Sequence, residues 1–177
     1  MSSNHYLKKL MQFCFHFYNK NDIMFREEKR CIYMEFISHS NNDTIEFAYN
    51  FGKSLQKGDV ILMTGDLGCG KTTFTKGIGK ALNVTKNINS PTFTILKIYK
   101  GDINLHHMDF YRLENTNLYD FDLAEYITDE TVNVIEWPFM KEDYLPSSYI
   151  LVDLTYIDEN TRKIKITYVG NKYSKEL

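Results

Sequence analysis

The chain has 177 residues, of which 43% are hydrophobic, 15% aromatic and 25% charged, a composition that excludes an intrinsically disordered protein and suits one folded domain. The formal net charge of -2 excludes a generally basic surface, so any role with RNA would need a partner or a local patch. The three cysteines have no CxxC spacing, which argues against a disulfide framework or a zinc site and favours a reducing compartment.

Residues 1–33 differ in character from the rest. The stretch from Tyr6 to Tyr18 is aromatic and basic, and it contains no acidic residue. Organellar targeting segments are also acid-poor, but they are rich in arginine and serine, and here the first arginine is Arg26. We therefore expect an N-terminal extension over 1–33, arising from an early start codon or an additional helix, with organellar targeting as the less favoured alternative, and a folded domain over 34–177.

A regular pattern begins after Met34. Apolar residues at helical spacing predict a helix over 40–55, with Asn and Asp residues before it as candidate N-caps. A Gly-Asp turn then leads into an apolar strand over 60–63. A glycine-rich loop over 65–72 follows this strand, and a second helical pattern covers 71–82.

The second half of the chain contains more predicted strands than helices. Strands alternating with helices, followed by two strands around a turn, predict an α/β domain with a mixed sheet and a C-terminal β-hairpin. The predicted strands cover 94–99, 103–108, 132–135, 149–156 and 163–168, and a helix is predicted around 118–126.

The loop Gly65-Asp66-Leu67-Gly68-Cys69-Gly70-Lys71-Thr72 matches the phosphate-binding pattern GxxxxGK[ST] in full. Main-chain amides of such a loop, with the start of the following helix, surround the phosphates of a nucleotide. Glycines permit the positive φ angles and the close approach that this wrapping requires. Lys71 would neutralise the β- and γ-phosphates, and the Thr72 hydroxyl would bind Mg²⁺.

Two carboxylates follow apolar strands, where they can face a ligand at the carboxyl edge of the sheet. Glu136 ends the strand over 132–135 and Asp109 ends the strand over 103–108, and either could instead cap a helix or pair with a basic residue. The Ser90-Pro91-Thr92 segment fits equally a γ-phosphate sensor or an ordinary loop. His106 and His107 would point to opposite faces of a strand, which argues against a shared metal site.

The blocks GDLGCGKTTFTKGIGKAL, SPTFTI, LHHMDFYRL and VIEWP occur in this order. Together they closely resemble the TsaE (YjeE) family, the small ATPase in bacterial synthesis of threonylcarbamoyladenosine at position 37 of tRNAs that read ANN codons. The resemblance runs from about Met34 to the C-terminus. It implies a P-loop NTPase-like three-layer domain with a mixed, mainly parallel central sheet.

The resemblance also implies ATP or ADP and Mg²⁺ as cofactors. Lys71 and Asp109 match catalytic positions, and Thr72 and Glu136 match the magnesium ligands. Cys69 stands where the family usually has alanine, a small-for-small change that should leave phosphate binding intact. The implied nucleotide-binding residues are Thr44, Gly68, Cys69, Gly70, Lys71, Thr72, Thr73, Trp137 and Arg162.

As a TsaE-like protein, the chain would hydrolyse ATP slowly alone and act with the TsaB–TsaD complex. It would meet tRNA only through that complex, bind neither membrane nor DNA, and reside in the cytoplasm. Two other functions stay open: a nucleotide-gated interaction module with negligible turnover, and a small P-loop kinase, although the chain has few arginines to clamp a second substrate. A GTPase is disfavoured because the NKND sequence at 19–22 precedes the P-loop and no DxxG follows it.

Overall fold

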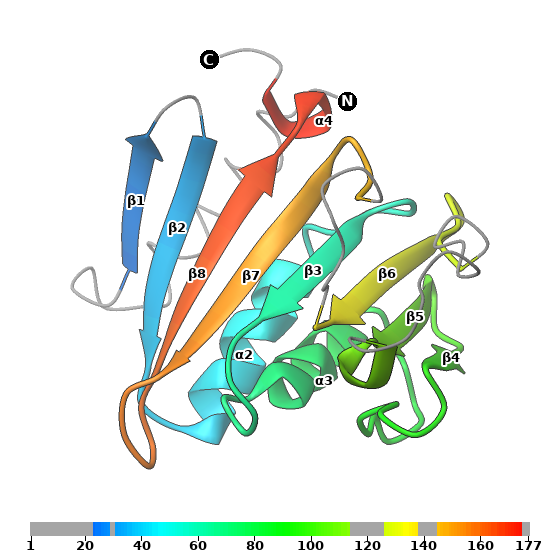
Figure 1. The fold of residues 1–177 in the computed structure, drawn as a ribbon, viewed down its shortest axis with the longest axis horizontal. Coiled ribbons are helices and arrows are strands. Elements are labelled where there is room, and N and C mark those ends of the chain that lie inside the picture. Colours follow the sequence, from blue (N-terminus) through cyan, green and yellow to red (C-terminus); the bar gives the residue numbers. More distant parts are fainter. Residues whose placement is uncertain (1–22, 29–30, 114–125, 138–144, 175–177) are drawn as a thin grey trace.

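The computed structural model describes residues 23–28, 31–113, 126–137 and 145–174. These residues form one eight-stranded sheet with two longer helices on one of its faces (Figure 1). The strands are β1 (Ile23–Glu28), β2 (Cys31–Ser38), β3 (Val60–Thr64), β4 (Leu96–Tyr99), β5 (Asn104–Asp109), β6 (Thr131–Glu136), β7 (Tyr149–Tyr156) and β8 (Arg162–Val169). The helices are α2 (Asn41–Gly52), α3 (Lys71–Ala81), the short α4 (Asn171–Ser174) and the 3-10 turn η1 (Tyr111–Leu113).

The sheet is mixed, as predicted, but it is partly rather than mainly parallel, and its strand order is β1-β2-β8-β7-β3-β6-β5-β4. Parallel pairing is confined to the centre, where β3 lies between β7 and β6, and β6 also pairs with β5. The outer strands pair antiparallel, including the predicted C-terminal hairpin of β7 and β8. The four central strands therefore end at one common edge, which is where ligands bind in parallel sheets.

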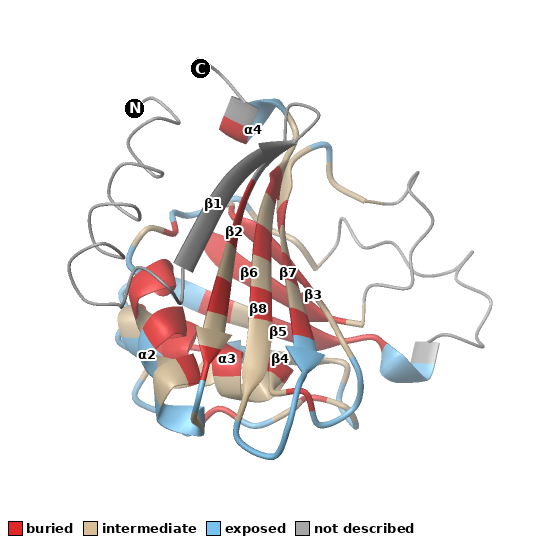
Figure 2. Ribbon diagram, turned by 90° about the vertical axis from the view of Figure 1, so that its left-hand side faces the viewer, coloured by how far each residue is buried: buried red, intermediate tan, exposed pale blue. Residues whose placement is uncertain are grey.

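The larger hydrophobic core lies between the sheet and the helices. Helix α2 begins at Ser40, whose side chain accepts a hydrogen bond from the amide of Asp43. A Cβ atom at Gly77 of α3 would lie 2.5 Å from the Cβ of Ala48 in α2, so glycine allows the two helices to approach closely. Figure 2 shows the buried residues concentrated where α2 and α3 meet the sheet. Aromatic rings from β2, α2 and α3 fill this core, namely Phe36, Phe47, Phe51 and Phe74.

A second, smaller core covers the opposite face of the central strands. Val60 and Leu62 of β3 belong to it, whereas Ile61 and Met63 belong to the larger core. Side chains of a strand alternate between the two faces of a sheet, so β3 is apolar from Val60 to Met63 because both of its faces are buried there. The glycine-rich loop begins directly after this buried strand.

The helices predicted over 40–55 and 71–82 and the strands from β3 to β8 are confirmed, with ends that shift by a few residues. The sequence analysis does not predict β1 or β2. The expected domain boundary after residue 33 falls inside β2, which pairs with the preceding β1 and also with β8. Because β8 lies far away in the sequence, local patterns do not reveal that second pairing. The aromatic stretch from Tyr6 to Tyr18, the NKND sequence and the helix expected at 118–126, except for Tyr126, lie outside the described residues.

Within the described residues, no helix combines the length and the apolar character needed to span a bilayer.

Candidate functional site

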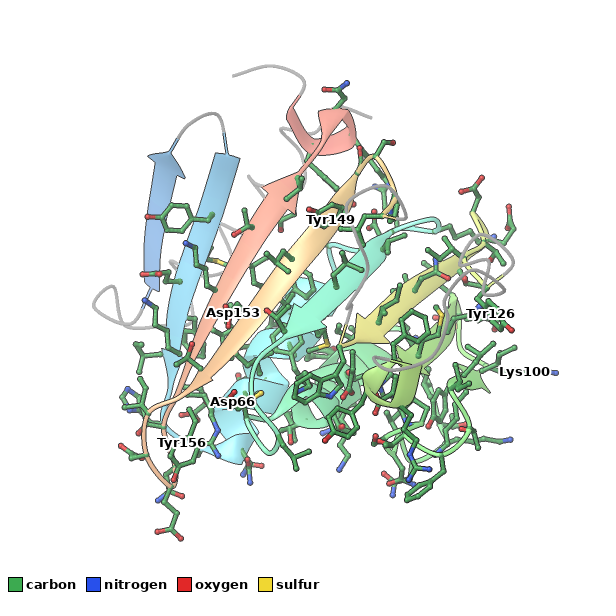
Figure 3. All side chains as sticks on the ribbon, in the orientation of Figure 1. Asp66, Lys100, Tyr126, Tyr149, Asp153 and Tyr156 are labelled. Carbon is green, nitrogen blue, oxygen red and sulfur yellow. The ribbon has the colours of Figure 1, made fainter. Side chains whose placement is uncertain are left out.

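The glycine-rich loop joins the end of β3 to the start of α3 at the common edge of the central strands. Gly65, Gly68 and Gly70 have φ angles of 124°, 80° and 110°, as predicted for a loop that wraps around a ligand. Helix α3 begins at Gly70 without a side-chain cap, which leaves its first amides available for an anion. In Figure 3, Asp66 of this loop lies at the same end of the molecule as Tyr156, which ends β7. Tyr149 lies at the opposite end of β7.

Lys71, near the end of the loop, is buried, with a relative exposure of 5%. Its ammonium group donates hydrogen bonds to the carbonyl oxygens of Gly65 and Asp66 at 2.7 and 3.0 Å. The same group lies 3.6 Å from the centre of the Trp137 ring. A lysine held at this place presents its charge to the centre of the loop, where phosphates would lie.

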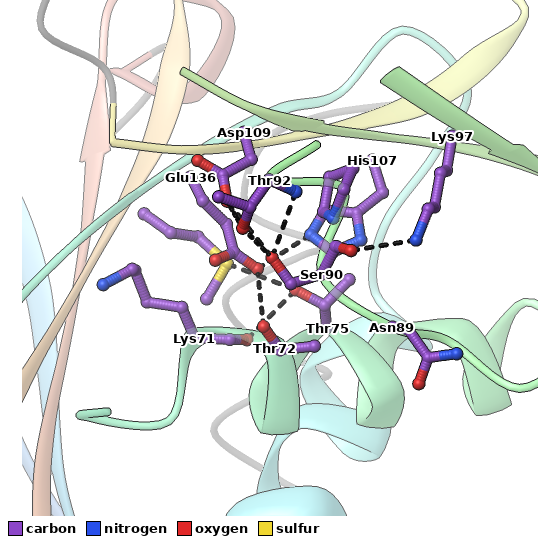
Figure 4. Close-up of polar contacts among 12 residues, drawn as sticks. Lys71, Thr72, Thr75, Asn89, Ser90, Thr92, Lys97, His107, Asp109 and Glu136 are labelled. Carbon is purple, nitrogen blue, oxygen red and sulfur yellow. Dashed lines mark hydrogen bonds and ion pairs between the residues drawn. The ribbon is translucent and has the colours of Figure 1, made fainter. Parts of the chain in front are cut away.

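Glu136 and Thr72 approach each other across the mouth of the loop. The Thr72 hydroxyl donates to Oε1 of Glu136 at 3.2 Å, and Nε2 of His107 lies 2.7 Å from the same oxygen (Figure 4). Glu136 ends β6, whereas His107 comes from the neighbouring strand β5. A hydroxyl and a carboxylate are hard oxygen donors, which suit Mg²⁺.

Asp109 at the end of β5 holds the segment that follows α3. Its Oδ2 accepts hydrogen bonds from the hydroxyls of Ser90 at 3.1 Å and Thr92 at 2.6 Å, and its Oδ1 accepts one from the amide of Tyr111 at 3.0 Å (Figure 4). Lys97 donates to the carbonyl oxygen of Ser90 at 2.8 Å. The Ser-Pro-Thr segment is therefore tied to a carboxylate of the site rather than being an isolated surface turn.

These groups surround one cleft of about 400 Å³, a size that suits a small-molecule ligand. Eight of the residues predicted for the site line the cleft: Gly68, Gly70, Lys71, Thr72, Thr73, Asp109, Glu136 and Trp137. Leu67, Ser90, Thr92 and Tyr111 complete the lining.

Trp137 directly follows Glu136 and has a φ angle of 56°, which is uncommon for a residue other than glycine. Its amide donates to the carbonyl oxygen of Met63 at the end of β3, and its ring lies 5.2 Å from that of Tyr111. The backbone turn places the indole over Lys71 and at the wall of the cleft.

Three other predicted residues do not line the cleft. Thr44 is 2% exposed, and its hydroxyl lies 2.7 Å from that of Ser38. Nε of Arg162 in β8 donates a hydrogen bond to the carbonyl oxygen of Cys69 at 3.0 Å, so Arg162 supports the backbone of the loop. Cys69 itself is fully buried, and burial raises the pKa of its thiol, although the nearby Lys71 opposes this effect.

The two adjacent histidines point in different directions, as the strand periodicity predicts. His107 contacts Glu136, whereas Nδ1 of His106 lies 3.1 Å from the carbonyl oxygen of Tyr126. The sequence analysis does not predict the contact with Glu136. His107 and Asp109 share one face of β5 and Asp109 is paired with Glu136, so the contact depends on the register of β5 against β6, which no sequence pattern specifies. Across the described segments, no group of three or more His, Cys, Asp or Glu side chains could hold a metal without further ligands.

Comparisons with known proteins agree on one family. The sequence model of a family described as "Threonylcarbamoyl adenosine biosynthesis protein TsaE" matches residues 38–164. The protein called tRNA threonylcarbamoyladenosine biosynthesis protein TsaE in Bacillus subtilis is 44% identical over 117 residues, which cover 66% of this chain and 73% of the relative. The protein of the same name in Treponema pallidum is 34% identical, and the match covers 75% of this chain and 99% of the relative.

A solved structure is also similar. The crystal structure of YdiB from Bacillus subtilis superposes with a TM-score of 0.68 and 32% sequence identity, covering 85% of this chain and 90% of that one.

Proposed function

The chain belongs to the TsaE family, and on that premise we propose that it is a magnesium-dependent ATPase required for threonylcarbamoylation of adenosine 37 in tRNA. The observation that carries the proposal is the convergence of Lys71, Thr72 and Glu136 at a loop whose glycines have positive φ angles. ATP and ADP are the proposed ligands of the cleft.

The loop amides and Lys71 would bind the phosphates. The uncapped start of α3 supplies main-chain donors, and the Lys71 ammonium group supplies a positive charge. That group donates hydrogen bonds to the carbonyl oxygens of Gly65 and Asp66 in this structure. Charge-assisted hydrogen bonds to phosphate oxygens are stronger than those to neutral carbonyls, so a bound triphosphate would compete well for this lysine. Thr73 and Gly68 also line the cleft.

The residues also fit a magnesium ion. Mg²⁺ in nucleotide sites takes one or two protein oxygens and completes its shell with phosphates and water. Thr72 and Glu136 would provide those two oxygens. When bound, the ion would neutralise charge on the β- and γ-phosphates.

Asp109 is the proposed residue that orients water or transmits the nucleotide state to a partner. Its carboxylate faces the cleft and accepts hydrogen bonds from Ser90 and Thr92, so a change at the phosphates can reach the 90–92 segment through it. Order-disorder changes in such segments accompany γ-phosphate loss in other P-loop proteins. The sequence fits either a γ-phosphate sensor or an ordinary loop at residues 90–92. The hydrogen bonds from Ser90 and Thr92 to Asp109 support the sensor role.

The proposed partner is the TsaB–TsaD complex, through which the chain would meet tRNA indirectly and in the cytoplasm. The net charge of -2 supports an indirect contact with RNA, because direct backbone binding needs basic surface. A kinase is less well supported, since Arg162 already donates to the backbone carbonyl oxygens of Cys69, Asp158 and Thr161.

A complementation experiment tests the function. The full chain, and the same chain carrying Lys71→Ala, are expressed in bacteria depleted of their own TsaE, and the modified nucleoside in digested tRNA is measured by mass spectrometry. We expect the wild-type chain to restore the modification and the variant to fail. Unrestored modification by a soluble, folded wild-type chain together with its cognate TsaB and TsaD would contradict the proposal.

A second measurement separates an ATPase from a nucleotide-gated module. ATP hydrolysis is followed with and without the TsaB–TsaD complex. Stimulation by the complex supports the ATPase, and unchanged turnover with intact nucleotide binding supports the module.

A further inference from the structure

The parallel pairing of β5 and β6 brings His107 to the proposed metal ligand. Asp109 is paired with Glu136, and His107 stands two residues earlier in β5. Because side chains alternate along a strand, His107 and Asp109 lie on the same face of the sheet as Glu136. Nε2 of His107 reaches Oε1 of Glu136 at 2.7 Å (Figure 4).

Both partners of this contact are removed from solvent. The side chain of His107 is 0% exposed and that of Glu136 is 4% exposed. A carboxylate buried to this extent is stable only when other groups donate to it. His107 and Thr72 both donate to Oε1, and in the described part of the chain no group donates to Oε2. Two donors on one oxygen fix the plane of the carboxylate and leave the other oxygen for a ligand.

The second ring nitrogen of His107 indicates why a histidine stands here. Nδ1 is buried and has no hydrogen-bond partner among the described residues. An unpaired buried nitrogen costs free energy that an apolar side chain of similar size would not. Packing alone therefore does not account for His107, and its contact with Glu136 does.

We propose that His107 is a positioning residue, which holds the Glu136 carboxylate in the orientation that binds Mg²⁺. The proposal rests on the magnesium–nucleotide site proposed above and adds to it a residue that does not touch the ligand. Partners behind a metal ligand typically change metal affinity by about 10- to 100-fold when they are removed. The effect should be confined to the metal, since the contacts of Lys71 and the loop amides do not involve His107.

Two near-isosteric variants test the proposal. His107→Gln keeps a nitrogen donor near the position of Nε2, and His107→Met has a similar length without a donor. The affinity for ATP is measured by calorimetry with Mg²⁺ and with EDTA. We expect His107→Met to weaken the magnesium-dependent affinity about 10- to 100-fold and to leave the affinity in EDTA unchanged, whereas His107→Gln should recover much of the loss.

His106→Met is the matched control. His106 is the preceding residue of β5, and its ring contacts the carbonyl oxygen of Tyr126 rather than Glu136. This variant should bind MgATP like the wild type. The thermal unfolding midpoint of each variant identifies any that is not folded.

The outcomes are distinct. The positioning role would be overturned if a folded His107→Met variant bound ATP with Mg²⁺ as tightly as the wild type. It would also be overturned if the variant lost the same affinity for ATP with Mg²⁺ as with EDTA. A wild type that binds no nucleotide would instead overturn the proposed function. If the methionine variant does not fold, the nitrogen resonances of His107 in the wild type decide: MgATP should shift the Nε2 signal and ATP in EDTA should not, and identical spectra would overturn the proposal.

Discussion

The ammonium group of Lys71 lies 3.6 Å from the centre of the Trp137 ring. Its hydrogen bonds to Gly65 and Asp66 hold it within its own loop. A cation over an indole gains about 0.5–2 kcal/mol, so the ring stabilises the lysine only weakly. A phosphate can therefore replace the ring as the partner of the ammonium group. Since the chain contains one tryptophan, the indole is a natural reporter of what the lysine contacts.

Glu136→Gln should separate metal binding from phosphate binding. The substitution keeps the size of the side chain and an oxygen for the donors Thr72 and His107, but it removes the negative charge. We expect the affinity for ATP with Mg²⁺ to fall by about 10-fold or more, and the affinity in EDTA to change little. Calorimetric titrations under the two conditions check this, and equal losses in both would remove Glu136 from the metal site.

Asp109→Asn should spare binding and impair the later step. Because Lys71 and the loop do not contact Asp109, the affinity for ATP should stay within about 3-fold of the wild type. Hydrolysis in the presence of TsaB–TsaD should fall about 100-fold, the size typical of a residue that positions a reacting water. A variant with normal hydrolysis and normal tRNA modification would leave Asp109 with a structural role only.

Gly65→Ala should destabilise the protein more than Gly68→Ala, although both residues have positive φ angles. A Cβ at Gly65 would lie 2.2 Å from the carbonyl oxygen of Leu154, whereas a Cβ at Gly68 would have no neighbour within 4 Å. The first variant therefore adds a steric clash to the backbone strain of about 1–2 kcal/mol that both share. Thermal unfolding of the two variants side by side checks this order, and equal midpoints would contradict it.

Cys69 should react slowly with iodoacetamide in the folded protein. Burial raises the pKa of its thiol, so less thiolate is present at pH 8 than for an exposed cysteine. This group stabilises the fold fully below the unfolded pKa, and the contribution is lost as the pH rises toward the higher folded pKa. Mass spectrometry of native and urea-unfolded protein compares the rates. Equal rates would show that the thiol is accessible.

The sequence predicted the core of the site because its signals are local. The pattern from Gly65 to Thr72 specifies a loop, and the strands before Asp109 and Glu136 are short apolar runs that end in a carboxylate. Their meeting at one edge follows from the parallel pairing of β5 with β6, and parallel strands were implied by the family resemblance. The cleft lining confirms that these residues come together.

The features that the sequence did not predict depend on contacts between residues far apart in the chain. Arg162 and Thr44 were expected near the nucleotide, but the first supports the loop through the carbonyl oxygen of Cys69 and the second packs against Ser38. One of the two partners of β2 is β8, which lies more than a hundred positions later, so no local pattern reveals that pairing. The role of His107 depends on the register of β5 against β6, which only the folded sheet defines.

The most direct test of the account is a titration of the wild-type protein with MgATP, followed by the fluorescence of Trp137 and by calorimetry. We expect a saturable fluorescence change with a matching heat of binding, because phosphates would draw Lys71 away from the indole. Lys71→Ala should weaken binding by about 10- to 100-fold, the loss expected for a charged hydrogen-bonding partner. Neither a fluorescence change nor heat in the folded wild type at millimolar MgATP would contradict the assignment of this cleft to a nucleotide.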